Sequence, residues 1–467
     1  MSLPRAFALL ALVLLAPLRA GAEAETAPAA EGLRGFGVEQ ARLMGMAALE
    51  AGRPDVAVEI ARALLTRDDT DAYAHFLMAT ALMRAGDLEG AQAAARRAHR
   101  HAQSPQQRYQ SARLTAVAAW NREHYGRAQW WLRRAADAAP GAAERELSIR
   151  ALRNVRARNP WQIDLQFSVN PSNNVNNGAS GEYNIIDGVP IVGWLSPDGQ
   201  ALSGLITEAR GQAAYRIRRG AGSETHVTGG LTLRRVDLSR ASRDRVPDLD
   251  PRIYDTHRAE IGLRHTIRPA DSPQVIAAEI GAGRQWARDG RDYSFARASV
   301  GWHRALGGHT LAGLTAAVEA REATPGQTRG DSVHSVQASL VRLRDNGDVI
   351  GGGLWFSGHD TQFAGRSSQG VGGYLSYELG REIGPAKLSG MLTVSRTGFS
   401  GYVVGPIAVP GGRRDDTYGA VLNVTFPGVS YAGFAPVVTL RTVRTRSNVS
   451  RFDTSQTGVS VGLRSQF

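Results

Sequence analysis

The chain has 467 residues, no cysteine and a formal net charge of +12 that comes almost wholly from arginine. This length leaves room for two domains, and the lack of cysteine excludes disulfides, thiol chemistry and thiolate metal sites. The arginines are spread along the chain and not gathered in one patch, so the positive charge does not indicate nucleic-acid binding. Alanine and leucine dominate before residue 155 and glycine is concentrated after residue 200. We therefore expect a helical region followed by a β-rich region.

The first 22 residues have the pattern of a secretory signal peptide. Arg5 precedes an apolar stretch over residues 6–16, and Ala20-Gly21-Ala22 predicts cleavage before Glu23. No later stretch approaches the ~18 uninterrupted apolar residues that a spanning helix needs. We expect an exported protein with a linker over residues 23–37, and one that can span a membrane only as a closed β-barrel.

Residues 38–158 carry a repeat of tetratricopeptide length. The stretch that begins at Gly52 recurs at Gly86, an offset of 34 residues, and a third copy begins at Glu123. Small residues recur where paired helices would touch, at Gly45, Ala79 and Ala116 in the first helices and Ala57, Ala91 and Ala128 in the second. A helix from about Ala142 to Arg158 would cap the stack. The pattern favours a tetratricopeptide-like α-solenoid, and a generic alanine-rich bundle is the alternative.

Such a solenoid has a concave face that usually binds a peptide or protein segment. Trp120, Trp130 and Trp131 would either supply aromatic anchors on that face or fill the seams between repeats. His99 and His101 lie two positions apart on a helix and so point to different faces. They make a poor metal pair, and we expect no metal and no cofactor.

From Trp161 onward the pattern changes to alternation with period two, interrupted by turn residues. Strands are predicted to begin near Trp161, Ser203, Glu224, Tyr254, Gln274, Tyr293, His309, Ser332, Asp348, Gln369, Lys387, Asp416, Pro436 and Thr454. This makes about fourteen, an even number as in single-chain outer-membrane barrels. Long polar connections over residues 170–202, 240–252 and 400–414 alternate with short ones such as residues 345–347. Aromatic residues near strand ends, including Trp355 and Tyr374, are expected to form interfacial girdles, and a soluble β-sandwich is the alternative.

The last predicted strand ends at Phe467. Val459, Val461 and Leu463 share one face with Phe467, while polar residues and glycine occupy the other face. Such a strand suits a wall between lipid and a wet lumen, and Phe467 is the expected signal for the barrel assembly machinery. The fold class is thus α + β in two domains, with residues 38–158 in the periplasm and residues 159–467 as a transmembrane barrel in the outer membrane of a Gram-negative bacterium.

Catalytic motifs are weak, and we predict that the protein is not an enzyme. Gly458-Val459-Ser460-Val461-Gly462 satisfies the G-x-S-x-G string, but that motif needs a turn from strand to helix with an acid and a histidine following. Ser460 is instead predicted in the middle of a strand, and no histidine follows His359.

The order of signal peptide, short tetratricopeptide-like domain and barrel of about fourteen strands resembles the surface lipoprotein assembly modulators, the Slam proteins of the type XI secretion system. Two stretches add to the resemblance: residues 169–177 after the first strand, and residues 436–441 with 446–449 before the last. The resemblance implies translocation of client proteins, either surface lipoproteins or related secreted β-rich proteins, across the outer membrane. The helical region is shorter and richer in alanine than is typical of that family.

Candidate contacts for a client or a gate are Asn173, Asn174, Asn176, Ser447 and Asn448. The alternative for the asparagine cluster is a hydrated turn that uses asparagine's tolerance of left-handed backbone. Expected partners are the client, outer-membrane lipid and lipopolysaccharide, with no nucleic acid. Two other functions remain open from the sequence: an exopolysaccharide export porin with a short repeat domain, and a passive structural barrel.

Overall fold

The structure is a computed structural model that describes residues 37–189, 192–288, 292–323, 330–361, 365–429 and 434–465. The expected signal peptide, all of the expected linker except Gly37, and Phe467 lie outside these residues. The chain divides into two compact units, a helical unit that ends at Asn159 and a barrel unit that begins at Pro160. Each unit is described by itself below.

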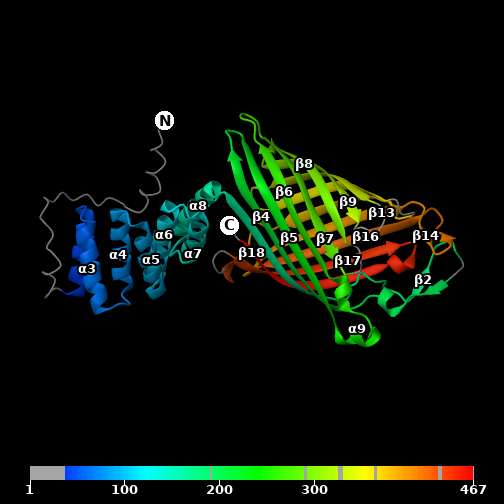
Figure 1. The fold of residues 1–467 in the computed structure, drawn as a ribbon, viewed down its shortest axis with the longest axis horizontal. Coiled ribbons are helices and arrows are strands. Elements are labelled where there is room, and N and C mark those ends of the chain that lie inside the picture. Colours follow the sequence, from blue (N-terminus) through cyan, green and yellow to red (C-terminus); the bar gives the residue numbers. More distant parts are fainter. Residues whose placement is uncertain are drawn as a thin grey trace. The chain divides into compact units, whose positions relative to one another are not determined.

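The helical unit consists of seven described helices, each packed against the next along the chain (Figure 1). They are α2 (Val38–Glu50), α3 (Pro54–Arg67), α4 (Ala72–Ala85), α5 (Leu88–His101), α6 (Pro105–Asn121), α7 (Tyr125–Asp137) and α8 (Ala142–Arg158). Side-chain caps fix several starts: Asp71 accepts hydrogen bonds from the backbone of Tyr73 and Ala74, and Ser104 accepts one from Gln107. None of these helices is long and apolar enough to cross a membrane, taken over the described residues.

Small residues lie where the helices meet, as the repeat predicts. The six predicted contact residues are all buried, and Ala57, Ala79, Ala91 and Ala128 are 0% exposed. A Cβ atom at Gly45 would lie 2.3 Å from Cδ2 of Leu77, so α2 approaches α4 more closely than a side chain would permit. The predicted solenoid is confirmed.

The barrel unit is a closed sheet of fourteen antiparallel strands. They are β1 (Trp161–Ser172), β4 (Gly204–Arg219), β5 (Ser223–Leu238), β6 (Thr256–Ile267), β7 (Gln274–Ala287), β8 (Tyr293–Gly307), β9 (Thr310–Ala323), β10 (Asp331–Leu343), β11 (Val349–Asp360), β12 (Ser368–Glu378), β13 (Lys387–Phe399), β16 (Arg413–Thr425), β17 (Phe434–Ser447) and β18 (Thr454–Ser465). The prediction of about fourteen strands is confirmed. Each predicted start lies within about three residues of the observed one, an error usual for element boundaries.

The wall has an apolar outer face and a polar inner face. On β1, Trp161, Ile163, Leu165 and Phe167 are exposed by 51%, 65%, 75% and 61%, and they share the outer face. Their register partners on β4, among them Tyr215, continue the apolar face across the sheet. A closed antiparallel sheet with an apolar exterior and a polar interior has the construction of a transmembrane barrel.

The two rims differ in the length of their connections. One rim, called the long-loop rim here, carries residues 173–203, 239–255 and 400–412 (Figure 1). The opposite short-turn rim carries connections such as residues 220–222 and 344–348, and β1 begins at this rim. In the 344–348 turn, the amide of Arg344 donates to the carbonyl of Asp348 at 2.8 Å, and Gly347 supplies the left-handed residue with φ 84°.

The long connections contain structure that period-two patterns do not predict. They hold two small hairpins, β2 (Tyr183–Ile185) with β3 (Val192–Trp194) and β14 (Val403–Val404) with β15 (Ile407–Ala408). They also hold one short helix, α9 (Arg240–Arg245), and short 3₁₀ turns such as η3 (Pro197–Gly199) and η4 (Pro251–Tyr254).

Candidate functional site

The candidate site is the lumen of the barrel together with its long-loop rim. Strand register places alternate residues on the inner face. Over β4 to β9 this face carries many charged side chains, which we call the charged arc: Glu208, Arg210, Arg258, Glu260, Arg264, Glu279, Arg297, Glu319 and Arg321. Arg264 and Glu279, partners on neighbouring strands, lie 2.9 Å apart.

Three arginines share two carboxylates at the centre of the charged arc. Arg258 lies 2.8 Å from Glu319 and 3.4 Å from Glu260. Arg297 lies 3.5 Å from Glu260, and Arg321 lies 2.7 Å from Glu319. The cluster therefore carries a net positive charge that faces the lumen, and each cation is fixed in place by a carboxylate.

Aromatic rings hold two of these arginines against the wall. The guanidinium carbon of Arg258 lies 3.7 Å from the ring centre of Phe295, and that of Arg321 lies 4.8 Å from the ring centre of Tyr293. Phe295 is 4% exposed, and a Cβ atom at the neighbouring Gly283 would lie 2.5 Å from its ring. The missing side chain at Gly283 thus makes room for the ring that supports Arg258.

The inner face of β10 to β18 is different and is called the neutral arc. Between the rims it carries mainly hydroxyl, amide, aromatic and glycine residues: Ser335, Gln337, Ser339, Trp355, Ser357, Tyr374, Ser376, Thr393, Ser395, Thr417, Thr439 and Ser460. Arg441 is the one charged side chain that we find on this face between the rims in the described part of the chain.

Two aromatic rings of the neutral arc lie flat on glycines of the neighbouring strand. Trp355 on β11 faces Gly372 on β12, and Tyr374 on β12 faces Gly353 on β11. Cβ atoms at Gly372 and Gly353 would lie 2.3 and 2.6 Å from these rings. Trp355 and Tyr374 therefore line the lumen, and their assignment to an interfacial girdle was wrong. Phe356 takes the outer face because adjacent strand residues point to opposite sides.

An apolar cluster sits on the lumen face of β4 and β5 at the long-loop rim. Its buried members are Val175, Leu202, Ile206, Val236, Leu238 and Val246. Arg234 on β5 ties two connections to it, because its guanidinium donates to the carbonyl of Val175 at 3.2 Å and to that of Tyr254 at 3.1 Å. Burial raises the pKa of the Tyr254 phenol, while a hydrogen bond with Asn176 opposes that shift.

A second apolar cluster links the β2–β3 segment to the β14–β15 segment and to the β17–β18 turn. Ile186, Val409 and Val449 form its buried centre. Arg413 lies beside it, with its guanidinium carbon 3.3 Å from the ring centre of Phe452 and 4.1 Å from that of Phe399. The two clusters give the long-loop rim a packed interior, so the connections there are held in defined positions.

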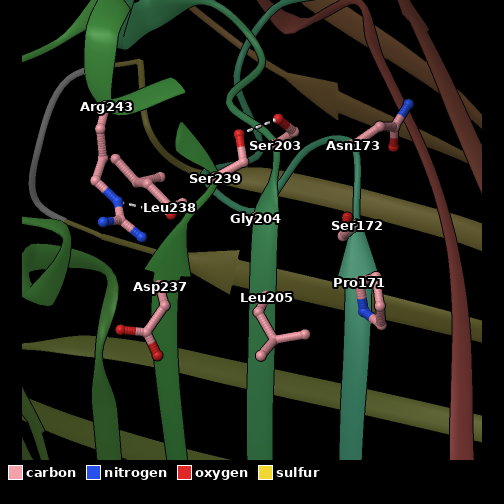
Figure 2. Close-up of a pocket in the computed structure, with 10 residues that line it drawn as sticks. All are labelled: Pro171, Ser172, Asn173, Ser203, Gly204, Leu205, Asp237, Leu238, Ser239 and Arg243. Carbon is pink, nitrogen blue, oxygen red and sulfur yellow. Dashed lines mark hydrogen bonds between the residues drawn. The ribbon is translucent and has the colours of Figure 1, made fainter. Parts of the chain in front are cut away.

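An open pocket of about 550 Å³ lies where β1, β4 and β5 reach the long-loop rim (Figure 2). Ser203 and Ser239 share a hydrogen bond of 2.7 Å across it, and Nε of Arg243 donates to the carbonyl of Leu238 at 2.9 Å. Because these polar groups bond one another, the pocket presents few free polar groups to a ligand.

The three predicted asparagines after β1 all bond backbone groups at this rim. The carbonyl oxygen of the Asn173 side chain accepts from the amide of Thr457 at 2.7 Å. Asn174 exchanges hydrogen bonds with Gly178 at 2.8 and 2.9 Å, and it is 1% exposed. Asn176 donates to the carbonyls of Asp198 and Gln200 at 3.0 and 2.8 Å. Their role in client contact stays a prediction, and the contacts present are those of loop organisation.

Ser447 and Asn448 organise the adjoining part of the same rim, where β17 ends two strands away from β1. The Asn448 side chain accepts from the amide of Arg414 at 2.7 Å and donates to the carbonyl of Gly412 at 2.9 Å. Ser447 donates its backbone amide to Asp453 and accepts from the amide of Val449 at 3.2 Å. The alternative for the asparagine cluster was a turn with left-handed backbone. Asn177 has such a backbone, with φ 54°.

Sequence reasoning missed several residues that hold the site together. Arg234, Asp453 and Gln456 act through contacts with distant segments, and no local motif marks them. Ser460 of the G-x-S-x-G string lies within β18 opposite Thr439, in an extended strand and not at a turn into a helix. The described residues include no group of three or more His, Asp and Glu side chains placed to hold a metal ion.

In the helical unit, the three tryptophans divide between seams and surface. Trp120 and Trp131 pack against buried residues between neighbouring helices, and Trp130 is 41% exposed. Leu43 on α2 is 70% exposed and is the other large apolar side chain on the surface of the described helices. His99 packs edge-on against Trp131, and burial lowers its pKa.

These features define the class: a transmembrane β-barrel of the outer-membrane type, preceded by a stack of helical repeats. The tetratricopeptide repeat family matches residues 48–115. No protein among the curated sequences matches the chain.

Solved structures resemble each unit separately. The type III secretion translocator chaperone SycD of Yersinia enterocolitica is 16% identical, with 27% of this chain and 90% of that chain covered and a TM-score of 0.24. The outer-membrane protein OmpT of Vibrio cholerae is 9% identical, with 66% and 98% covered and a TM-score of 0.34. OprB of Pseudomonas putida is 12% identical, with 67% and 96% covered and a TM-score of 0.38.

Proposed function

We propose that the protein is an outer-membrane translocator that moves client proteins across the membrane, with no enzymatic activity. The observation that carries the proposal is the direct covalent joining of a tetratricopeptide stack to a polar-lined, fourteen-stranded barrel. The first module is typical of peptide and protein binding, and the second offers a route through the membrane. The clients would be surface lipoproteins or related secreted β-rich proteins, as in the Slam family that the sequence resembles.

The rims support an orientation for this function. Outer-membrane barrels carry short turns on the periplasmic side and long loops on the outside. The chain enters β1 at the short-turn rim, so the helical unit would reside in the periplasm. Arg444 and Arg446 share the outer face of β17 near the long-loop rim, where they would meet the phosphates of lipopolysaccharide. Phe467 would be read by the barrel assembly machinery.

The helical unit would act by raising the local concentration of client. A binding module tethered at the mouth of a pore keeps a weakly held client near that pore, and cutting the tether loses this gain without changing the pore. Exposed Leu43 and Trp130 are candidate apolar contacts for a client on this unit.

A truncation tests the proposal. A variant with the signal peptide joined to residues 159–467 is expected to insert in the membrane as a heat-modifiable barrel yet to fail to display a client on the surface. Surface proteolysis of a co-expressed exported lipoprotein or β-rich protein encoded beside the gene measures display. Equal display by the full-length and truncated proteins, with insertion confirmed, would count against the translocator.

A second candidate function, an exopolysaccharide export porin, is favoured by one feature of the lumen. Trp355 and Tyr374 present ring faces to a pore whose opposite wall carries arginines, an arrangement that suits acidic sugars. Such a porin would conduct as well or better without its helical unit. Planar-bilayer conductance of both forms, with and without an acidic polysaccharide, separates it from the translocator and from a passive structural barrel.

A further inference from the structure

The seam between the first and last strands is paired along only part of its length. β1 pairs with β4 at every residue from Trp161 to Ser172. With β18, its other neighbour, it forms two register pairs, Val169 with Val461 and Ser172 with Gly458. Both pairs lie in the half of β1 nearer the long-loop rim. β18 is registered with β17 at each of its residues from Thr454 to Ser465, so the gap lies at the β1–β18 seam.

Side chains reinforce the outer half of the seam. Asn173 bonds both backbone groups of Thr457, donating its own amide at 3.4 Å and accepting at 2.7 Å. Nδ2 of Asn174 donates to the carbonyl of Ser455 at 3.4 Å, and Gln456 donates to Ser172 and to the carbonyl of Asn174. We call these contacts the asparagine clasp. They hold the two strands together around the two register pairs, between which residues 170 and 171 have no register partner on β18.

The inner half lacks such contacts. Residues 165–168 of β1, which face described residues of β18 when the register is continued, have no register partner there, although a Cβ atom at Gly462 would still lie 3.5 Å from the carbonyl oxygen of Phe167. The strands thus run close at Phe167 without forming a ladder. Asp164 and Gln166 on the inner face are exposed, and their side chains bond each other at 3.0 Å.

An unpaired strand edge within hydrocarbon has a defined chemical requirement. An amide or carbonyl without a partner in lipid is unfavourable, so the edge favours a group that supplies backbone hydrogen bonds along a line. An extended strand is the ligand with that geometry. It would carry apolar residues beside Leu165 and Phe167 and a polar residue beside Gln166, because the two faces of β1 differ in this way.

We propose that residues 165–168 of β1 form a strand-addition site that binds an extended amphipathic segment of the exported client, with the asparagine clasp as the fixed end of an opening seam. This inference rests on the proposed translocator function and names the part of the client that the barrel recognises. The sequence of β18 is an example of a segment that fits β1. Its residues 454–465 alternate between apolar and polar side chains, and two of them already pair with the outer half of β1.

A peptide probe tests the site on the full-length protein in detergent micelles. The probe has the sequence of residues 454–465 with cysteine in place of the leucine at position 463, which falls opposite Phe167 when the β1–β18 register is continued. The chain has no cysteine of its own, so a mixed disulfide reports a single position. Phe167→Cys is the target, and Leu354→Cys is the matched control because Leu354 is also an exposed outer-face residue but lies on a strand paired on both sides.

We expect the probe to label Phe167→Cys and not Leu354→Cys, and a scrambled peptide of the same composition to label neither. Equal labelling of the two variants, or no labelling of Phe167→Cys in a heat-modifiable barrel, would overturn the proposal.

A seam lock then tests whether the site is used in export. In Phe167→Cys/Leu463→Cys, oxidation after assembly should close the seam and abolish client display, and a reductant should restore it. Phe167→Cys/Ala209→Cys staples β1 to β4 instead, at a registered pair, and should leave display unchanged. Unchanged display with a formed lock would refute client docking at the seam. If the barrel captures the peptide but displays no client in either the oxidised or the reduced form, the translocator function is refuted. Strand addition at β1 would then still stand.

Discussion

The helical unit and the barrel use the same residue type for opposite purposes. In the helical unit, Gly45 lets Leu77 of a neighbouring helix approach within a dry core. In the barrel, Gly372 lets the ring of Trp355 lie flat on the wall of a wet lumen. In the first case the missing side chain allows close packing, and in the second it keeps the pore wide. Substitution of these glycines should therefore change stability in one unit and conduction in the other.

The largest effect is expected for Gly45→Leu. Its Cβ atom would fall 2.3 Å from Leu77, and overpacking of a closely packed core costs about 1–3 kcal/mol of unfolding free energy. Thermal unfolding of residues 37–158, followed by circular dichroism at 222 nm, should show a lower midpoint than the unsubstituted fragment. A fragment that is a random coil before substitution would remove the basis for an independent helical unit.

Gly372→Ala tests the other half of the comparison. Its Cβ atom would lie 2.3 Å from Cζ2 of Trp355, so the ring must turn into the lumen and single-channel conductance should fall. The barrel should still be heat-modifiable, because the backbone ladder is untouched. Gly390→Ala is the control, since its Cβ atom meets only the carbonyl of Val421 at 3.6 Å. Equal conductance of the two variants would show that the ring does not border the conducting path.

Gly126→Ala sharpens the comparison from the opposite direction. Gly126 lies in α7, and a Cβ atom there would meet nothing within 4 Å. Alanine loses less backbone entropy than glycine on entering a helix, so the unfolding free energy should rise by about 0.5 kcal/mol. A higher midpoint than wild type in the same thermal experiment checks this, and a lower one would mean that α7 has a neighbour at that position.

The last effect concerns pH and is confined to the helical unit. Burial lowers the pKa of His75, whose Nε2 donates to the carbonyl of Asp69 at 2.8 Å. The folded state then binds a proton less readily than the unfolded state, so stability is full above about pH 6.5 and falls as the pH drops below that value, by less than about 1.4 kcal/mol per pH unit. Urea unfolding of the fragment at pH 7.5 and 5.5 measures the slope. His75→Gln should reduce this slope. The part of the slope that remains should come from His99, whose pKa is also lowered by burial.

Local periodicity was sufficient to predict most of the fold. The 34-residue offset and the small residues at Ala57 and Ala91 identified the helix contacts, because each repeat packs only on its neighbours. The strand starts followed from period-two alternation, because each strand has one face in lipid and one in the lumen. The pattern also held the information that Trp355 and Phe356 must face opposite sides, which the girdle assignment overlooked.

The rest of the site depends on contacts between distant parts of the chain. Asn173 meets Thr457, and Asn176 meets Gln200, through hydrogen bonds that no sequence spacing marks. Each strand in the two hairpins of the long-loop rim has only two or three residues, which is too short to give a periodic signal in the sequence. The incomplete β1–β18 seam is also invisible in the sequence, because both strands alternate normally and only their pairing differs.

The charged and neutral arcs face each other across one lumen, since β6, β7 and β8 lie opposite β13, β16 and β17 in the closed sheet. A cationic cluster on one side of a narrow, low-dielectric wall produces an electric field directed across the pore and not along it. An extended polypeptide carries alternate side chains on opposite edges. In such a field it has a preferred rotation about its own axis, with acidic residues turned toward Arg258 and Arg297 and hydroxyl residues toward Thr393 and Thr417. The barrel would thus select the angular orientation of a passing chain, and would distinguish segments by the spacing of their acidic residues.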